Sequence, residues 1–167
     1  MIFVYGFGPY KEFQDNISAN VISLLPLLAG VHSHVFDTAF DRGMFEAAFE
    51  LAQPNYILGL GQSRRETHLQ LESIAKNLMR DTGIDPAAIS SSVAESERML
   101  RWTLPLESDC AGSKDAGSYV CNYSMWIAEE WAREHDAKSA FIHIPVAFDV
   151  QRVVDYVTSI LKRVKAE

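Results

Sequence analysis

Cysteine is scarce in this sequence, which holds 2 cysteines, Cys110 and Cys121, in 167 residues. Two cysteines are too few for the disulfide framework on which small secreted domains depend. The opening residues, MIFVYGFGPY, also lack the basic region and the small-residue cleavage site of a signal peptide. Together these absences predict a cytoplasmic protein.

Long apolar runs and an excess of positive charge are absent as well. The longest mainly apolar stretch, residues 21–31, is interrupted by Ser23, Pro26 and Gly30 and is too short to cross a bilayer. The net charge is −7 and the 15 Lys and Arg residues are scattered, so we expect neither a membrane nor a nucleic-acid partner. The dense basic run at residues 162–165 is typical of the last turn of a helix.

What the chain does have is an ordinary globular composition, with 48% hydrophobic and 22% charged residues. A length of 167 residues suits one domain with a sizeable hydrophobic core and is too short for two domains of ordinary size. No internal repeat or low-complexity linker divides the chain. We therefore expect one domain over residues 1–167.

The first part of the chain alternates short strands with amphipathic helices. Apolar, β-rich runs predict strands at residues 2–5, 31–36 and 56–60, and helical spacing of large apolar side chains predicts helices over residues 17–28 and 45–52. Alternation of this kind is typical of an α/β sheet whose strands are joined by crossover helices.

The second part of the chain continues the same alternation after an interruption. Residues 69–74 predict a strand, a helix follows Gly117, residues 140–144 predict a further strand, and residues 150–164 form an amphipathic final helix. Between the first two of these elements, residues 81–97 are rich in Ser, Asp and Gly and predict an excursion over the surface.

Cys121 stands where a thiol can be reactive. The segment AGSYVCN runs from a glycine turn at Gly117 into a predicted helix, which puts Cys121 in or near the first turn. The partial positive charge at a helix N-terminus favours the thiolate, which is the nucleophilic form. Free cysteine is also among the residues most often buried, so a plain core thiol is the competing interpretation.

His143 and Glu72 are the two partners that such a thiol needs. His143 ends the predicted strand FIHIP, at the edge of the sheet where α/β proteins bind ligands. Glu72 is a carboxylate in an apolar strand, where burial is costly unless the group is paired. Each can also be an ordinary core or surface side chain, but together with Cys121 they make a Cys–His–acid set.

Two other patterns compete with this set. His32 and His34 place two imidazoles on one face of a predicted strand near Asp37, as in some zinc hydrolases, but no further cluster has ligand spacing. Gly59-Leu60-Gly61 follows a strand, but the rest of a dinucleotide-binding fingerprint is missing. We therefore predict no metal and no cofactor.

Several separated segments resemble the pyroglutamyl-peptidase I (pyrrolidone-carboxylate peptidase) family. VYGFGPY resembles the family's G-F-x-P-F opening, and NIS resembles the N-P-S that follows it. GLGQSRRETHLQLESIAKN resembles the glycine-rich block that ends in E-R-[IV]-A-x-N. AGSYVCNY resembles A-G-x-[FY]-[LV]-C-N, and FIHIP resembles F-[IM]-H-[VI]-P. The segments keep the family's order, so the chain is identified as a short and divergent member.

The resemblance implies a fold, an activity and a set of site residues. The fold would be a single-domain three-layer α/β/α sandwich, phosphorylase/hydrolase-like, around a twisted, mostly parallel mixed sheet. The activity would be that of a cysteine exopeptidase that removes an N-terminal pyroglutamyl residue from a small peptide through a thioester. The motifs assign the catalytic roles to Cys121, His143 and Glu72. They assign substrate binding to Phe7, Tyr10, Asn16 and Gln62.

The sequence departs from the family pattern at positions that concern the substrate. Tyr10 stands for Phe, Ile17 for Pro and Ser73 for the Arg after the acid, and the Arg of the glycine-rich loop is displaced to Arg65. The family's A-R-I-P-D-N segment is not recognisable in LMRDTGIDPAAIS, where Arg80 is out of register. Two alternatives stay open: a cysteine amidase or thioesterase for another small acyl group, and a non-catalytic binding member. Homo-oligomerisation also stays open.

Overall fold

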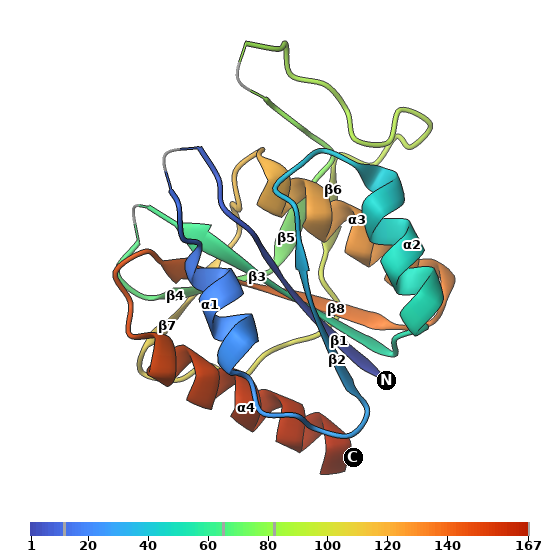
Figure 1. Ribbon diagram of the computed structural model, residues 1–167. Coiled ribbons are helices and arrows are strands. Elements are labelled where there is room, and N and C mark those ends of the chain that lie inside the picture. The colour runs from blue at the N-terminus through green and yellow to red at the C-terminus, as the bar shows by residue number, and fades with distance from the viewer. Residues whose placement is uncertain (12, 65, 82, 167) are drawn as a thin grey trace.

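A computed structural model describes residues 1–11, 13–64, 66–81 and 83–166. Its centre is a 6-stranded sheet with the strand order β2-β1-β3-β8-β4-β7 (Figure 1). The strands are β1 (Ile2–Phe7), β2 (Val31–Phe36), β3 (Tyr56–Ser63), β4 (Leu69–Glu72), β7 (Cys110–Ser113) and β8 (Lys138–Pro145). Neighbouring strands pair in parallel, except that β4 is antiparallel to β8. The sheet is therefore mixed and mostly parallel, as predicted.

Helices cover both faces of this sheet. They are α1 (Ile17–Leu24), α2 (Arg42–Ala52), α3 (Val120–Glu134) and α4 (Val150–Ala166). Figure 1 shows α1 beside α4 and α2 beside α3. Each pair packs over its own apolar core, so the arrangement is a three-layer α/β/α sandwich and the predicted fold class is confirmed.

Alternation along β1 supplies both cores from one strand. Successive side chains of a strand point to opposite faces of the sheet. Phe3 and Tyr5 accordingly pack into the core under α2 and α3, while Ile2 and Val4 pack into the core under α1 and α4. A strand buried on both faces reads as a continuous apolar run, which is why β1 could be predicted from the sequence.

The first helix is shorter than its periodicity predicts. We expected a helix over residues 17–28, but α1 ends at Leu24, and Leu25 has extended backbone angles of φ −63 and ψ 136. Leu25 precedes Pro26, and the proline ring disfavours the helical conformation in the residue before it. The apolar residues beyond this point continue the spacing without continuing the helix.

Between β4 and β7 the chain forms a small second sheet and an exposed excursion. The sheet pairs β5 (Ile74–Lys76) antiparallel with β6 (Glu97–Met99). Sequence patterns missed both strands and β7, because three or four residues are too few to establish alternation. The chain between β5 and β6 projects past the start of α3 (Figure 1), and residues 83–88 are all exposed, as the predicted surface excursion requires.

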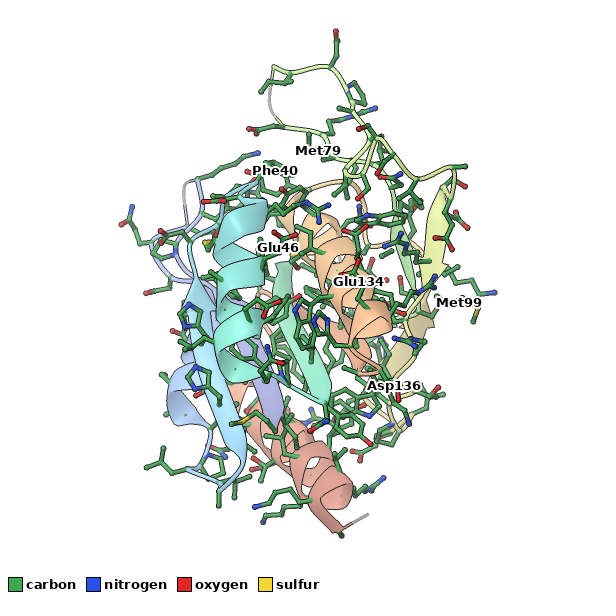
Figure 2. The ribbon with its side chains drawn as sticks, turned by 90° about the vertical axis from the view of Figure 1, so that its right-hand side faces the viewer. Phe40, Glu46, Met79, Met99, Glu134 and Asp136 are labelled. Carbon is green, nitrogen blue, oxygen red and sulfur yellow. The ribbon has the colours of Figure 1, made fainter. Side chains whose placement is uncertain are left out.

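Charged residues fasten the end of this excursion to α3. Arg98 lies 3.2 Å from Glu130, and Arg101 lies 3.0 Å from Glu129. The Ser139 hydroxyl also donates to the fully buried Glu129 carboxylate. Figure 2 shows Met99, which lies between the two arginines in sequence, beside α3. A buried carboxylate is tolerated only when it is paired and hydrogen-bonded, and Glu129 meets that condition.

In the part of the chain that the structure describes, no helix is long and apolar enough to cross a membrane.

Candidate active site

A cavity of about 490 Å³ opens where the ends of β3 and β8 meet the start of α3. Ligand sites in α/β proteins commonly lie at the carboxyl ends of parallel strands. Residues that are far apart in the sequence line this cavity, among them Gln62, Gln70, Glu72, Tyr119, Cys121 and His143. The three residues that sequence motifs predict to be catalytic are therefore neighbours in space.

His143 and Glu72 form a direct pair between β8 and β4. The His143 Nδ1 atom lies 2.8 Å from Glu72 Oε1, and the two residues are 9% and 7% exposed. The antiparallel pairing of β4 with β8 brings them together, because Gln70 lies opposite His143 and Glu72 follows two residues later on the same face. A carboxylate at Nδ1 favours a proton there, so Nε2 is the ring nitrogen left for chemistry.

The electrostatic environment favours a charged His143 ring. Burial lowers the tendency of the ring to take a proton, but the Cys121 sulfur and the Glu72 carboxylate outweigh burial and raise the pKa of His143 to about 10. Cys121 acts on the ring both through charge and through a side-chain hydrogen bond. An imidazolium beside a sulfur stabilises the thiolate, which is the reactive form.

Cys121 is the second residue of α3, so the predicted placement in the first turn is confirmed. The residue before the helix, Tyr119, has extended backbone angles and makes no side-chain hydrogen bond to the first turn. The first N–H groups of a helix have no partner within the helix itself. In α3 these N–H groups belong to the turn that carries Cys121, where they can stabilise negative charge on sulfur or on a reacting oxygen.

The second oxygen of Glu72 has no hydrogen-bond partner among the described residues. Glu72 Oε2 is buried and unpaired, while Oε1 accepts from His143. A buried acceptor normally has a partner, which can be water or a ligand group where the acceptor borders a cavity. Glu72 lines the cavity, so this oxygen is available to a donor inside it.

Of the residues predicted to bind substrate, Gln62 lies at the cavity, and Tyr10 packs against a residue that lines it. Gln62 lines it, and Gln62 Oε1 accepts a hydrogen bond of 3.0 Å from the Ile17 N–H at the start of α1. Tyr10 packs its ring 4.9 Å from the ring of Tyr119, which lines the cavity. Burial, and a hydrogen bond with Tyr10, raise the pKa of Tyr119, so its hydroxyl stays neutral.

Phe7 and Asn16 lie apart from the cavity. Phe7 is 2% exposed and packs edge-on against Tyr5 and Phe45 in the core under α2 and α3. Asn16 caps α1: its Oδ1 accepts from the Ser18 N–H, and its Nδ2 donates to the Gly8 carbonyl. Both side chains serve the fold, because Phe7 continues the inward alternation of β1 and Asn is among the best N-cap residues.

Sequence reasoning missed Tyr119. It is the aromatic residue of the AGSYVCN segment, two positions before Cys121, so the motif held the signal. Arg80, the cation of the unrecognised middle segment, is exposed, and its backbone N–H donates to the Ser118 carbonyl. Arg65 lies outside the described residues.

The competing histidine pair shows no sign of a metal site. His32 and His34 stack along β2 with ring centroids 6.5 Å apart. Among the described residues, no group of three or more His, Cys, Asp or Glu side chains could hold a metal ion.

Proteins of similar sequence are named pyrrolidone-carboxylate peptidase or pyroglutamyl-peptidase 1. No family model matches the chain. A pyrrolidone-carboxylate peptidase of Streptococcus pyogenes is 28% identical over 177 residues, which cover 92% of this chain and 80% of the relative. One of Deinococcus radiodurans is 28% identical over 84% of this chain and 75% of the relative. Mouse pyroglutamyl-peptidase 1 is 26% identical over 86% of this chain and 78% of the relative.

Solved structures of proteins with the same names share the fold. Pyrrolidone carboxyl peptidase from Thermococcus litoralis superimposes with a TM-score of 0.82 at 18% identity, over 96% of this chain and 91% of that chain. Pyroglutamyl peptidase I from Bacillus amyloliquefaciens gives a TM-score of 0.81 at 21% identity, over 94% and 92% of the two chains. The chain is thus a divergent relative of the pyrrolidone-carboxylate peptidases, the family that its motifs predict.

Proposed function

We propose that this chain is a cysteine exopeptidase that hydrolyses the amide bond after an N-terminal pyroglutamyl residue. One observation carries the proposal: Cys121 and the His143–Glu72 pair converge on one cavity, with 2.8 Å between the His143 and Glu72 atoms. The names of the sequence relatives supply the substrate class. The whole chain, residues 1–167, acts as one catalytic domain.

The reaction proceeds through a thioester. The Cys121 thiolate attacks the pyroglutamyl carbonyl carbon, and the carbonyl oxygen becomes an oxyanion held by N–H groups of the first turn of α3. The His143 imidazolium gives its proton to the departing amine, so the amide C–N bond breaks. Water, deprotonated by His143, then attacks the thioester carbon and releases pyroglutamate and the free thiol. Glu72 holds the ring in position throughout.

The cavity offers a flat lactam the contacts that it needs. The face of Tyr119, backed by Tyr10, supplies an aromatic wall for the ring. The Gln62 side-chain amide supplies a donor for the lactam carbonyl, and the unpaired Glu72 Oε2 supplies an acceptor for a donor on the substrate. Phe7 and Asn16 contribute indirectly, through the core and the start of α1.

Release of a fluorescent amine from a pyroglutamyl amide tests the proposal. Cys121→Ala should abolish release while the protein stays folded, because it removes the sulfur that interacts with His143. Cys110→Ala is the matched control, since Cys110 is the other free and partly exposed cysteine. It should keep the activity of the unmodified protein. Full activity of Cys121→Ala would disprove the assignment.

A second candidate keeps the catalytic residues and changes the acyl group. Tyr10 stands where the family has Phe, and its hydroxyl bonds to that of Tyr119 at the aromatic wall. Added polarity there favours a cysteine amidase or thioesterase for another small acyl group. Amides of pyroglutamic, prolyl and acetyl groups, compared by kcat/KM, separate the two. A pyroglutamyl amide that ranks below the others would establish the second candidate.

If the chain is a non-catalytic binding member of the family, Cys121 should be unreactive. Iodoacetamide should therefore alkylate Cys121 faster than Cys110 if the chain is an enzyme, because only Cys121 lies beside His143. Equal rates at the two thiols would favour the binding role.

A further inference from the structure

Two glycines of β3 lie under the start of α3, in the segment Gly59-Leu60-Gly61. A Cβ atom built on Gly61 would lie 2.6 Å from Cys121 Sγ and 2.8 Å from Phe141 Cζ, both inside the 3.0 Å that real Cβ atoms essentially never reach. The sulfur therefore occupies space that exists only because Gly61 has no side chain.

The Phe141 ring shares the space over Gly61 with the sulfur. Phe141 is 1% exposed and lies over both glycines, since a Cβ on Gly59 would also overlap its ring. A Cβ on Gly59 would in addition lie 2.6 Å from Tyr5 Oη, and the sulfur is not among its three nearest atoms. The two glycines thus make similar room for buried aromatic rings, and Gly61 alone makes room for Cys121.

From this geometry we infer that Gly61 is a positioning residue for the nucleophile. The space over Gly61, which the Phe141 ring also borders, seats the Cys121 sulfur beside His143, because Gly61 and His143 are register partners on neighbouring strands. A side chain at residue 61 displaces the sulfur from the His143 ring. The catalytic consequence rests on the proposed function, whereas the seating of the sulfur does not.

The helix that carries Cys121 has little freedom to move away from such a side chain. Asn122 is fully buried and holds β5, accepting from the Lys76 N–H at 2.8 Å and donating to the Lys76 and Leu78 carbonyls at 2.9 and 2.8 Å. On the other flank, the Tyr5 hydroxyl donates to Ser124 Oγ at 3.0 Å. Ser124 Oγ in turn donates to the Cys121 carbonyl at 2.8 Å. The sulfur must therefore shift within a fixed first turn.

Gly61→Ala, with Gly59→Ala as its matched control, tests the inference. In Gly61→Ala, iodoacetamide should alkylate Cys121 about tenfold more slowly near neutral pH, because the sulfur no longer lies beside the His143 ring. Release of amine from a pyroglutamyl amide should fall about 10²-fold, chiefly in kcat, as for a reacting group misplaced by about 1 Å. Gly59→Ala should lower the melting temperature and slow the alkylation of Cys121 far less, because the sulfur is not among the atoms nearest to its added Cβ.

A double-mutant cycle keeps the test independent of activity. Because the sulfur is the nearest of the atoms in conflict, Gly61→Ala should lower the melting temperature less in a Cys121→Ala background than in the unmodified protein. Additive losses, or an unchanged alkylation rate of Cys121 in Gly61→Ala, would overturn the inference. Failure of the unmodified protein to cleave any pyroglutamyl amide would instead overturn the proposed function, since the alkylation rates and the cycle still report on Gly61.

Discussion

The two ends of α3 are held in opposite ways. At its N-terminus, steric fits and hydrogen bonds between neutral groups fix the turn that carries Cys121: the slot at Gly61, the Asn122 side chain and the Tyr5–Ser124 pair. Further along, Glu129 and Glu130 are held by ion pairs to Arg98, Arg101, Arg133 and Arg42.

The contrast separates two kinds of sensitivity. A steric slot offers one geometry, so small changes there should alter chemistry more than stability. A network in which several arginines share two carboxylates fastens a segment that carries none of the proposed catalytic groups. Changes in the network should alter stability more than chemistry. The start of α3 therefore fixes the position of Cys121, whereas the ion pairs further along the helix attach a neighbouring segment to it.

Removal of the base at the cavity should have the largest effect. His143→Gln keeps a side chain of similar size but cannot take the proton, so kcat/KM for a pyroglutamyl amide should fall by about 10³- to 10⁴-fold. The melting temperature should change little by comparison. If His143→Gln loses activity only because it unfolds, the contrast between the two ends of α3 is wrong.

The protonation of His143 should be the next largest effect. The pKa of His143 is raised to about 10 because the Cys121 sulfur and Glu72 outweigh burial, so activity that needs the imidazolium should persist to about that pH and fall above it. In Cys121→Ala the largest raising influence is gone and burial remains, so the pKa should drop. NMR titration of the His143 ring measures both values. A midpoint that is the same with and without the sulfur would contradict this account.

The aromatic wall should show a smaller effect, confined to substrate binding. Tyr119→Ala removes the face against which the lactam packs and should raise KM about tenfold, the scale of one lost aromatic contact. Tyr10→Phe removes only the hydroxyl bonded to Tyr119, so its KM should change less. A rise in KM for Tyr10→Phe as large as that for Tyr119→Ala would show that the hydroxyl pair, and not the ring face, meets the substrate.

A change at the ion-pair end of α3 should leave the rate intact. Glu129→Gln keeps the shape of a fully buried side chain but removes the charge that pairs with Arg101 and Arg133. Because both arginines are about one-third exposed, we expect a loss of about 1–3 kcal/mol in the free energy of unfolding, below the full penalty for a buried pair. Urea denaturation measures it. The exposed Glu95→Gln is the control and should cost far less, with kcat unchanged in both variants.

Much of this architecture could be predicted from the sequence because it depends on local pattern. The continuous apolar run of β1 and the periodicity of α4 indicated their elements directly. The glycine at residue 117 and the apolar spacing after it placed Cys121 in the first turn of a helix. The extent of α1 was wrong, since the apolar spacing of residues 17–28 outlasts the helix that Pro26 ends.

The remainder depends on strands and helices that meet only after folding. By itself the sequence determined the α/β alternation, the thiol at a helix N-terminus and the histidine at a strand end, because these follow from spacing along the chain. Only the tertiary structure decided that Glu72 meets His143, which needs the antiparallel pairing of β4 with β8. It also placed Phe7 in the core and Tyr119 at the cavity. The role of Gly61 also depends on the tertiary structure, because only the folded chain packs the Cys121 sulfur against that glycine.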